Sequence, residues 1–313
     1  MQNHELTLTH AGKGEPMAAG VQAIFGEAAA IISGLADERE RAARHDILER
    51  ASKGTFDSFL FVRDEKPAAI ICYETIDDDA RLVTGHALRA IDIDKENIFE
   101  TAVKALVEKG FRVIRSNFNW PEPDTYAKKA REMGFIVTER LSMSIDNDPE
   151  YAVRPLKEGE IVPWSQSYFN DVARVMSVTV DPVDKMVYPR FQTYDGCQTM
   201  LRTIVENGYG EFQPALSYVA MCDGQFAGYL LSTLYPDSSM LIVDIGVDEA
   251  FRHKGLASGM IGRLVKNSAA FGKRRIDLAV TASNLTALSL YRHMGFRVAE
   301  TFMQHIFVAD GRK

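Results

Sequence analysis

Apolar residues in the last third of the chain follow two different periods. Residues 241–247 and 276–280 are short, mostly apolar runs, which favour buried strands. The apolar residues between them recur with the spacing of one helix face: Leu256, Met260, Ile261, Leu264 and Val265. The pattern predicts an amphipathic helix from residue 256 to about residue 272, where Gly272 is a typical C-terminal stop.

A shorter helix is predicted after the second strand. Residues 282–284 (Ala-Ser-Asn) indicate a turn, and residues 285–294 a helix that ends at Gly295. The predicted order is therefore strand, loop, helix, strand, turn and helix.

The loop before the long helix is basic and contains a glycine. It reads Arg252-His253-Lys254-Gly255, directly before the predicted helix start at Leu256. The first turn of a helix has unpaired backbone N–H groups and a partial positive charge, and a glycine lets an anion approach the backbone closely. Together these features predict a phosphate-binding loop.

Two motifs cover this region. The first is Arg252-x-x-Gly255-x-Ala257, and the second is Asn284-x-x-Ala287-x-x-x-Tyr291-x-x-x-Gly295-Phe296. In this order and at this separation they resemble the GNAT superfamily of acyl-CoA-dependent N-acetyltransferases. The resemblance covers residues 151–308 and implies an α/β (α+β) fold, in which a mixed, mostly antiparallel central sheet is flanked by helices.

The same resemblance implies acetyl-CoA as the co-substrate, entering between two central strands that splay apart, here 241–247 and 276–280. Gly246 suits such a distortion, because glycine within a strand often marks a bulge or a close backbone approach. Backbone groups of residues 245–247 would bond the cofactor, and one N–H would hold the developing oxyanion. The implied cofactor-binding residues are Ile245, Gly246, Val247, Arg252, His253, Lys254, Gly255, Leu256, Ala257, Ser258, Asn284 and Tyr291.

Two residues are candidates for proton transfer. Tyr291, seven residues after Asn284, would act as general acid for the leaving CoA thiolate, although a packed tyrosine is the alternative. Asp244 is the candidate general base, or else it orients an arginine or caps a loop. Glu211, Tyr229, His253 and a water chain to solvent remain further alternatives for the base.

The two halves of the chain resemble each other. Residues 59–70 parallel residues 218–229 as hairpins that turn at an Asp-containing pair, and residues 131–135 parallel residues 292–296. A helix at 98–110 and a strand at 111–116 match the later helix and second strand. We interpret the chain as two tandem GNAT-like lobes, 1–149 and 150–313, with a linker at 146–149 and an opening strand at 153–156.

The first lobe lacks the candidate chemistry. Residues 91–97, which correspond to the basic loop, contain carboxylates that would repel a pyrophosphate, and no glycine. Ala130 stands where the second lobe has Tyr291. We therefore expect 1–149 to be a degenerate lobe without an acetyl-CoA site, and 150–313 to be the catalytic domain.

Composition excludes several classes of protein. The 313 residues carry a formal net charge of −7, which argues against a nucleic-acid partner. No apolar run reaches the roughly 20 residues of a membrane span, and the polar start resembles no secretory signal, so we expect no membrane and a cytoplasmic protein. The three cysteines lack a C-x-x-C spacing and suggest neither a disulfide nor a metal site.

These observations predict an acetyl-CoA-dependent N-acetyltransferase that acts on the primary amine of a small molecule by direct attack, with one active site in the C-terminal lobe. The alternatives are a non-catalytic acyl-CoA-binding sensor and a protein lysine or N-terminal acetyltransferase. The aromatic stretch with Tyr188, Phe191 and Tyr194 lines the acceptor pocket in one interpretation and belongs to the core in the other. A monomer and a homodimer are both compatible with the sequence.

Overall fold

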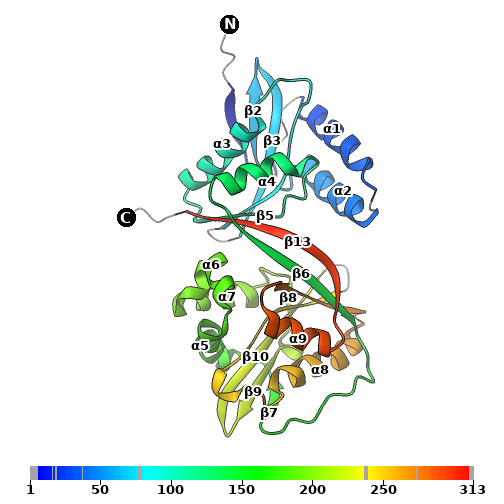
Figure 1. The fold of residues 1–313 in the computed structure, drawn as a ribbon, viewed down its shortest axis with the longest axis vertical. Helices are drawn as coiled ribbons and strands as arrows, with labels where there is room; N and C mark the ends of the chain where they lie inside the picture. Colours follow the sequence, from blue (N-terminus) through cyan, green and yellow to red (C-terminus); the bar gives the residue numbers. More distant parts are fainter. Residues whose placement is uncertain are drawn as a thin grey trace. The chain divides into compact units, whose positions relative to one another are not determined.

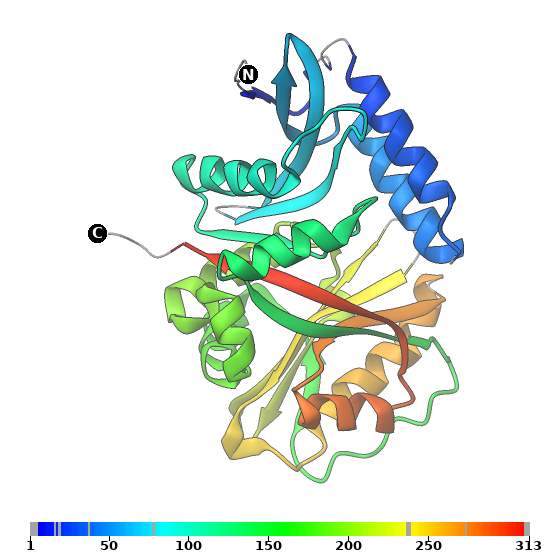
Figure 2. The ribbon, with the colours of Figure 1, turned by 45° about the horizontal axis from the view of Figure 1, so that its top comes forward.

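The computed structural model describes residues 6–15, 17, 20–36, 38–76, 79–235, 239–272 and 274–309. Two compact units make up the chain (Figures 1 and 2). Unit 1 comprises Met1–Thr138 with Met303–Lys313, and unit 2 comprises Glu139–Phe302. Each unit has a mostly antiparallel sheet with helices on both faces, as the sequence predicts.

The sheet of unit 1 has the order β1-β2-β3-β4-β5 followed by the end of β13, and only β4 and β5 are parallel among the first five. Its strands are β1 (Thr7–Ala11), β2 (Asp57–Arg63), β3 (Lys66–Ile76), β4 (Asp79–Ala87), β5 (Val113–Ser116) and the end of β13 (Arg297–Val308). Its helices are α1 (Val21–Ser33), α2 (Glu38–Ser52), α3 (Lys95–Glu108) and α4 (Pro123–Glu132).

Alternation along the strands divides the core of unit 1 into two layers. Phe59 and Phe61 of β2 pack with α3 and α4, whereas Leu60 between them packs with α1 and α2. Successive side chains of a strand point to opposite faces, so the two helix pairs cover opposite faces of the sheet.

The sheet of unit 2 has the order β6-β12-β11-β10-β9-β7, and β8 pairs with β10. Its strands are β6 (Ile136–Asp146), β7 (Glu160–Pro163), β8 (Glu211–Phe212), β9 (Tyr218–Cys222), β10 (Gln225–Leu234), β11 (Ser239–Val247) and β12 (Arg275–Thr281). Its helices are α5 (Phe169–Thr179), α6 (Pro182–Val187), α7 (Tyr194–Val205), α8 (Leu256–Ser268) and α9 (Leu285–His293). Helices α8 and α9 pack on one face, and α5 and α7 on the other.

The predicted strands and helices around the two motifs are present. Helix α8 begins at Leu256 and continues as a 3₁₀ turn to Phe271, and Gly272 ends it with φ 69°. Gly295 follows α9 with φ 97°. No helix in the described part of the chain combines the length and the apolar character that crossing a bilayer would need.

The same arrangement of strands occurs in both units. The hairpins β2–β3 and β9–β10 turn at Asp64-Glu65 and Asp223-Gly224, and all four residues have positive φ, as tight hairpin turns require. The register of β3 with β4 skips Val83, and the register of β10 with β11 skips Val243. Both copies therefore carry a β-bulge at the corresponding place.

The units divide differently from the predicted boundary at residues 149 and 150. Strand β6 begins in unit 1, but its residues Arg140–Asp146 pair with β12 of unit 2. Strand β13 begins in unit 2, and its residues His305–Val308 pair with β5 of unit 1. The linker predicted at 146–149 thus starts at the last residue of a strand that completes the sheet of unit 2.

The strand predicted at 153–156 does not form. Leu156 and Val153 instead pack on the glycine side of α8, where a Cβ on Gly259 would lie 2.7 Å from Leu156 Cδ2 and one on Gly262 would lie 3.6 Å from Val153 Cγ1. Pro155 also lacks the N–H that a sheet ladder needs. The edge strand of unit 2 is β7, which pairs with β9.

Candidate active site

The sheet of unit 2 opens between its two parallel strands. Residues 239–242 of β11 pair with residues 275–278 of β12, and no pairing continues beyond Ile242 and Leu278. Further along, β11 stays paired with β10 and β12 with β6. The two strands therefore part as the resemblance predicts, and the backbone of β11 after Ile242 has no ladder partner on the β12 side.

A cavity of about 130 Å³ lies at this opening. It is bordered by the parted strands, by the end of α5, by α6 and by the start of α9. Its described lining residues are Thr179, Val180, Asp181, Asp184, Phe191, Ile242, Val243, Asp244, Ile245, Leu278, Ala279, Val280, Asn284, Ala287 and Tyr291. Both predicted catalytic residues, Asp244 and Tyr291, are among them.

Gly246 does not form the bulge that the sequence suggests. It pairs regularly with Tyr229, and the skipped residue of β11 is Val243. Gly246 is needed for a close approach instead, because a Cβ there would lie 2.6 Å from Thr179 Oγ1 and 2.9 Å from the Tyr229 ring. The bulge is at Val243, and this residue and the next two, Asp244 and Ile245, all line the cavity.

Asp244 is held by two donors. The Tyr229 hydroxyl donates to Asp244 Oδ2 at 2.7 Å, and the backbone N–H of Ile245 donates to Oδ1 at 2.9 Å. Burial raises the pKa of Asp244 to about 6, while both hydrogen bonds act in the opposite direction. The carboxyl group is therefore mostly ionised at neutral pH but has a higher proton affinity than an exposed aspartate.

Tyr291 is 7% exposed, and its hydroxyl forms no hydrogen bond with any described residue. Burial is the largest cause that raises the pKa of Tyr291, followed by the negative charges of Asp244 and Asp184. The phenol therefore keeps its proton at neutral pH. Buried tyrosine hydroxyls usually find a partner, so an unpartnered one at a cavity indicates a group that meets a ligand.

Asn284 fixes the helix that carries Tyr291. Its side-chain oxygen accepts from the backbone N–H of Ala287 at 3.0 Å and caps α9. It also lines the cavity. The observed role is the cap, and cofactor binding by the same side chain stays a prediction.

The basic loop leads into a helix start that no side chain caps. Gly255 is the N-cap of α8 with φ 86°, in the left-handed region that suits glycine, and Leu256, Ala257 and Ser258 form the first turn. The Ser258 hydroxyl donates back to Gly255 O at 2.9 Å and leaves the first-turn N–H groups unbonded to side chains. Leu256 is buried in the core, so only its backbone can face a ligand.

The three basic residues of the loop have different surroundings. Arg252 is exposed, and its Nε donates to Val247 O at 3.3 Å. His253 is exposed with φ 64°. Lys254 forms an ion pair with Glu158, so it is engaged within the protein. Arg252 is therefore the cation of this loop that is most available to an anion.

The other candidates for the general base lie elsewhere. Glu211 is exposed on β8, and His253 is in the α8 loop; neither lines the cavity. Tyr229 is fully buried and donates to Asp244, so it supports that carboxylate. Of the side chains named as candidates for the base, Asp244 is the one that lines the cavity with Tyr291.

The sequence analysis missed the acidic side of the cavity. Asp184 Oδ1 accepts from Thr281 Oγ1 at 2.7 Å and from Arg140 Nη1 at 3.0 Å. Asp181 caps α6 by accepting from Val183 N at 2.8 Å. The sequence Asp181-Pro182 is a typical helix start, but nothing local shows that this helix borders the cavity.

Unit 1 has a different arrangement at the corresponding opening. Strand β4 pairs with β5 only over Asp79–Arg81, and beyond this point Gly85 of β4 lies against the indole of Trp120. Trp120 is fully buried among other aromatic rings, including Phe99 and Tyr126. By strand register, Gly85 corresponds to Ile245, which lines the cavity in unit 2.

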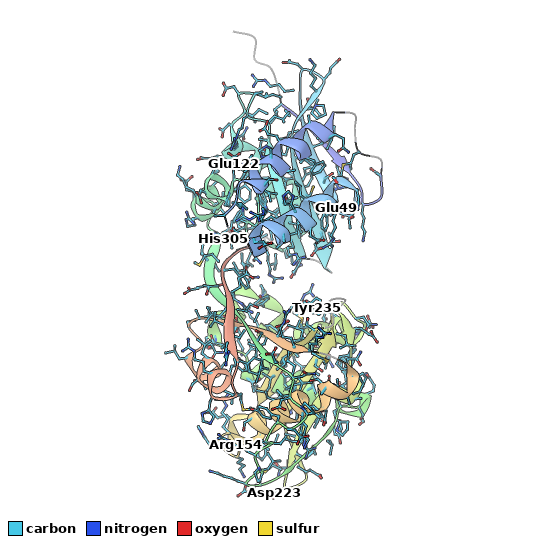
Figure 3. All side chains as sticks on the ribbon, turned by 90° about the vertical axis from the view of Figure 1, so that its right-hand side faces the viewer. Glu49, Glu122, Arg154, Asp223, Tyr235 and His305 are labelled. Atoms are coloured by element: carbon cyan, nitrogen blue, oxygen red, sulfur yellow. The ribbon has the colours of Figure 1, made fainter. Side chains whose placement is uncertain are left out.

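The helix start of unit 1 is also occupied. Asp94 caps α3, and its Oδ1 accepts from Glu96 N at 2.9 Å and from Asn97 N at 3.1 Å. Lys95 pairs with Glu122 at 2.8 Å (Figure 3 labels Glu122). A carboxylate of the chain itself thus takes the place where an anion would bind.

Comparison with known proteins agrees with this fold. Residues 187–296 match the profile of the acetyltransferase (GNAT) family. The protein is an acyltransferase, and its unit 2 carries a domain that belongs to the GNAT family. Among the curated relatives, one is an uncharacterized N-acetyltransferase, YdgE, of Bacillus subtilis (strain 168), which is 27% identical over 36% of this chain and 74% of its own length.

Another curated relative is L-2,4-diaminobutyric acid acetyltransferase of Marinococcus halophilus, which is 21% identical over 43% of this chain and 89% of its own length. Among solved structures, a tandem GNAT protein from the clavulanic acid biosynthesis pathway has 12% identity and a TM-score of 0.54. It covers 99% of this chain and 100% of that chain, and the likeness is one of fold. Among the described residues, no group of three or more His, Cys, Asp or Glu side chains is placed to hold a metal ion.

Proposed function

We propose that the protein is an acetyl-CoA-dependent N-acetyltransferase that acts on the primary amine of a small molecule, with one active site in unit 2. The observation that carries the proposal is the cavity between the parted strands β11 and β12, which brings together Asp244 and the unpartnered hydroxyl of Tyr291. Two features of unit 1 support a single active site in the chain. Asp94 caps the start of α3, and Trp120 packs against Gly85 at the opening between β4 and β5.

The residues present fit acetyl-CoA, which supplies the activated acetyl thioester when bound. The uncapped N-terminus of α8 offers backbone N–H groups and helix-dipole charge to a pyrophosphate, and Gly255 permits close approach. Arg252 adds an exposed positive charge beside them. The unpaired side of β11 after Ile242 offers backbone groups to the amides of a pantetheine arm.

Asp244 accepts the proton of the acceptor amine. An alkylammonium of pKa about 10.4 is almost wholly charged at neutral pH and must lose a proton before it attacks a carbonyl carbon. With a pKa of about 6, Asp244 is ionised and ready to accept that proton. The Tyr229 hydroxyl fixes Oδ2, so the proton is taken by an oxygen of defined orientation.

Tyr291 donates its proton to the leaving thiolate. Its raised pKa keeps the phenol protonated until negative charge develops next to it, and its hydroxyl has no competing protein partner. Asn284 sets the orientation of this group through the cap of α9.

The test is incubation of the full-length protein with acetyl-CoA and a panel of primary amines, followed by measurement of free CoA thiol and of acetylated product by mass spectrometry. We expect stoichiometric thiol and product, and kcat/KM that falls below about pH 6 as Asp244 becomes protonated. Asp244→Asn should remove this pH limb together with most of the activity. Tyr151→Phe is the matched control, because its hydroxyl donates to Met294 O outside the cavity.

Two results would redirect the proposal. Acetyl-CoA binding without thiol release for any amine would favour the acyl-CoA-binding sensor. Acetylation of peptide lysines or N-termini in preference to small amines would favour a protein acetyltransferase. Neither outcome is expected, because a cavity of about 130 Å³ suits a small acceptor and a sensor has no need of an unpartnered tyrosine at the site.

A further inference from the structure

The cavity of unit 2 is lined by charges of one sign. Asp181, Asp184 and Asp244 are among its described lining residues, and no Lys, Arg or His is. Arg140 compensates one of these charges by pairing with Asp184 at 3.0 Å. Two carboxylates remain without a paired cation, one of which is the base Asp244.

The carboxylates keep unused acceptor positions. Asp181 accepts from Val183 N through Oδ1, and its Oδ2 has no partner among the described residues. Asp184 uses Oδ1 for both Thr281 and Arg140, so its Oδ2 is unused as well. These oxygens come from α6, which follows α5 on the side of the cavity opposite the start of α9.

A second observation points to a ligand in this space. Tyr291 is more than nine-tenths buried, lines the same cavity and has an unpartnered hydroxyl. The acidic residues therefore surround a place that also contains a buried donor without a partner. Buried polar groups of this kind are satisfied when the ligand is present.

Proton transfer changes the charge balance of the cavity. A singly charged amine that gives its proton to Asp244 becomes neutral and leaves the Asp181 carboxylate without a cation. An acceptor with a second ammonium or guanidinium group keeps one positive charge after the transfer, and this charge can pair with Asp181 and the free oxygen of Asp184. An acceptor with a carboxylate at that end would be repelled.

We propose that the acceptor is a dication, a small diamine or a related amine with a second basic group and no carboxylate at its far end, and that Asp181 is the residue that selects it. This inference rests on the proposed N-acetyltransferase function. The reacting ammonium gives one proton to Asp244, the amine nitrogen forms the new bond to the acetyl carbon, and the carbon–sulfur bond breaks. Tyr291 protonates the leaving thiolate, and the second proton that the nitrogen loses restores the Tyr291 phenol. The second ammonium does not react.

Matched acceptors test the proposal with the full-length protein. Series of 1,ω-diaminoalkanes, n-alkylamines and ω-amino acids with three to six carbons differ only in the far group. We expect the best diamine to exceed its alkylamine in kcat/KM by roughly tenfold or more, the value of one partly buried ion pair, with the amino acid lowest. Added salt should reduce this preference.

The variant Asp181→Asn assigns the preference to one side chain. Asparagine keeps the oxygen that accepts from Val183 N, so α6 remains capped. Diamine KM should rise roughly tenfold with kcat little changed, and alkylamine kinetics should stay as in the wild type. Asp195→Asn is the control, since Asp195 is exposed at the start of α7 outside the cavity.

Each other outcome has a defined meaning. If alkylamines or amino acids are acetylated as fast as diamines, the inference is overturned and the N-acetyltransferase function stands. If the preference for diamines persists in Asp181→Asn, the selecting role of Asp181 is overturned. If no amine of any class gives thiol release, the proposed function fails and the acceptor class fails with it.

Discussion

The long helix after the parted strands begins in opposite ways in the two units. In unit 2 the N-cap of α8 is Gly255, which leaves the first-turn N–H groups uncapped by side chains. In unit 1 the N-cap of α3 is Asp94, whose carboxylate accepts from two of the corresponding groups. One fold thus leaves a helix start without a side-chain cap in one copy and caps it in the other, and the difference depends on a few side chains.

The openings between the two parallel strands of each unit also differ: one borders a cavity and the other is filled by a side chain. Ile245 of β11 borders a cavity, whereas Gly85 of β4 is covered by Trp120. An aromatic core stabilises unit 1 where unit 2 keeps space for a ligand. The two units thus differ at this opening in how side chains fill it, while the arrangement of their strands is the same.

The largest effect is expected from charge reversal at the open helix start. Arg252→Glu with Gly255→Glu brings two negative charges to the place proposed for a pyrophosphate, and each such contact costs about 4 kcal/mol near a protein surface. Acetyl-CoA affinity in calorimetric titration should fall by roughly 1,000-fold or more, from one site per chain in the wild type.

Unit 1 offers the matched control for this variant. Asp94→Ser keeps a capping oxygen on α3 but removes the charge. The titration should still give one site with unchanged affinity. Two acetyl-CoA sites per chain in the wild type would mean that unit 1 binds the cofactor. A second site that appears only in Asp94→Ser would mean that the Asp94 carboxylate blocks cofactor binding in unit 1.

Trp120→Ala tests whether the aromatic core around Trp120 stabilises unit 1 without affecting acetyl-CoA binding. Loss of this fully buried side chain should lower the free energy of unfolding of unit 1 by about 3–5 kcal/mol. Hydrogen exchange followed by mass spectrometry should show faster exchange within the strands of unit 1. Acetyl-CoA binding should not change.

The second tryptophan of the chain provides the comparison for that experiment. Trp164 packs in the core of unit 2 against Phe212, with ring centroids 5.1 Å apart. Trp164→Ala should accelerate exchange in unit 2 and reduce acetyl-CoA binding. Equal effects of the two variants on binding would contradict a functional division between the units.

Tyr291→Phe removes the proposed acid and leaves the ring in place. The ring packs 5.8 Å from Phe296, so the fold should be retained. We expect kcat to fall by roughly 100-fold with little change in acetyl-CoA affinity, as for loss of a general acid. Tyr126→Phe in unit 1 should leave the rate unchanged, and an unaltered kcat in Tyr291→Phe with chemistry rate-limiting would exclude Tyr291 from the mechanism.

The smallest expected effect is the pH dependence of stability that Asp244 causes. Burial raises its pKa from 3.8 to about 6, so the folded protein retains a proton that the unfolded chain releases at lower pH. The contribution of this group therefore becomes less favourable as pH rises from about 4 to about 6. Asp244→Asn should be more stable than the wild type by about 3 kcal/mol at pH 8 and nearly equal at pH 4.

Chemical denaturation at the two pH values checks this prediction. An asparagine oxygen can keep the bond from Ile245 N, while the amide NH2 can donate to the Tyr229 hydroxyl oxygen, so the change of the difference with pH reports the charge. A difference that does not vary with pH would show that Asp244 does not titrate in this range. A variant that is inactive and also more stable would be a direct case of activity gained at the expense of stability.

Local periodicity predicts the parts of this fold that depend on neighbours in sequence. Helix α8 and its glycine ends follow from the spacing of five apolar residues and from Gly272. The hairpin at Asp223-Gly224 follows from its turn residues. Tyr291 was predicted from its motif and Asp244 from its place near a strand end, and both line one cavity.

Contacts between distant segments were not predicted, for a physical reason. Nothing near Asp181 or Trp120 in the sequence indicates what lies across the sheet from them. The segment with Val153 and Leu156 reads as a strand, yet the glycine face of α8 offers it a better packing surface. Strand partners are likewise a matter of long-range register, so the residues of β6 and β13 could not be assigned to their sheets.

The crossing of β6 and β13 from one unit to the other restricts how this protein can change. Deletion of the first 149 residues would strip β12 of the strand that pairs with all seven of its residues from Arg275 to Thr281. The exposed N–H and C=O groups would then pair with other chains. Loss of residues after Phe302 would open one side of β5 in the same way, although β4 still pairs with its other side. A cut at either place therefore exposes a sheet edge, so the chain can be shortened only where both sheets keep their last strand.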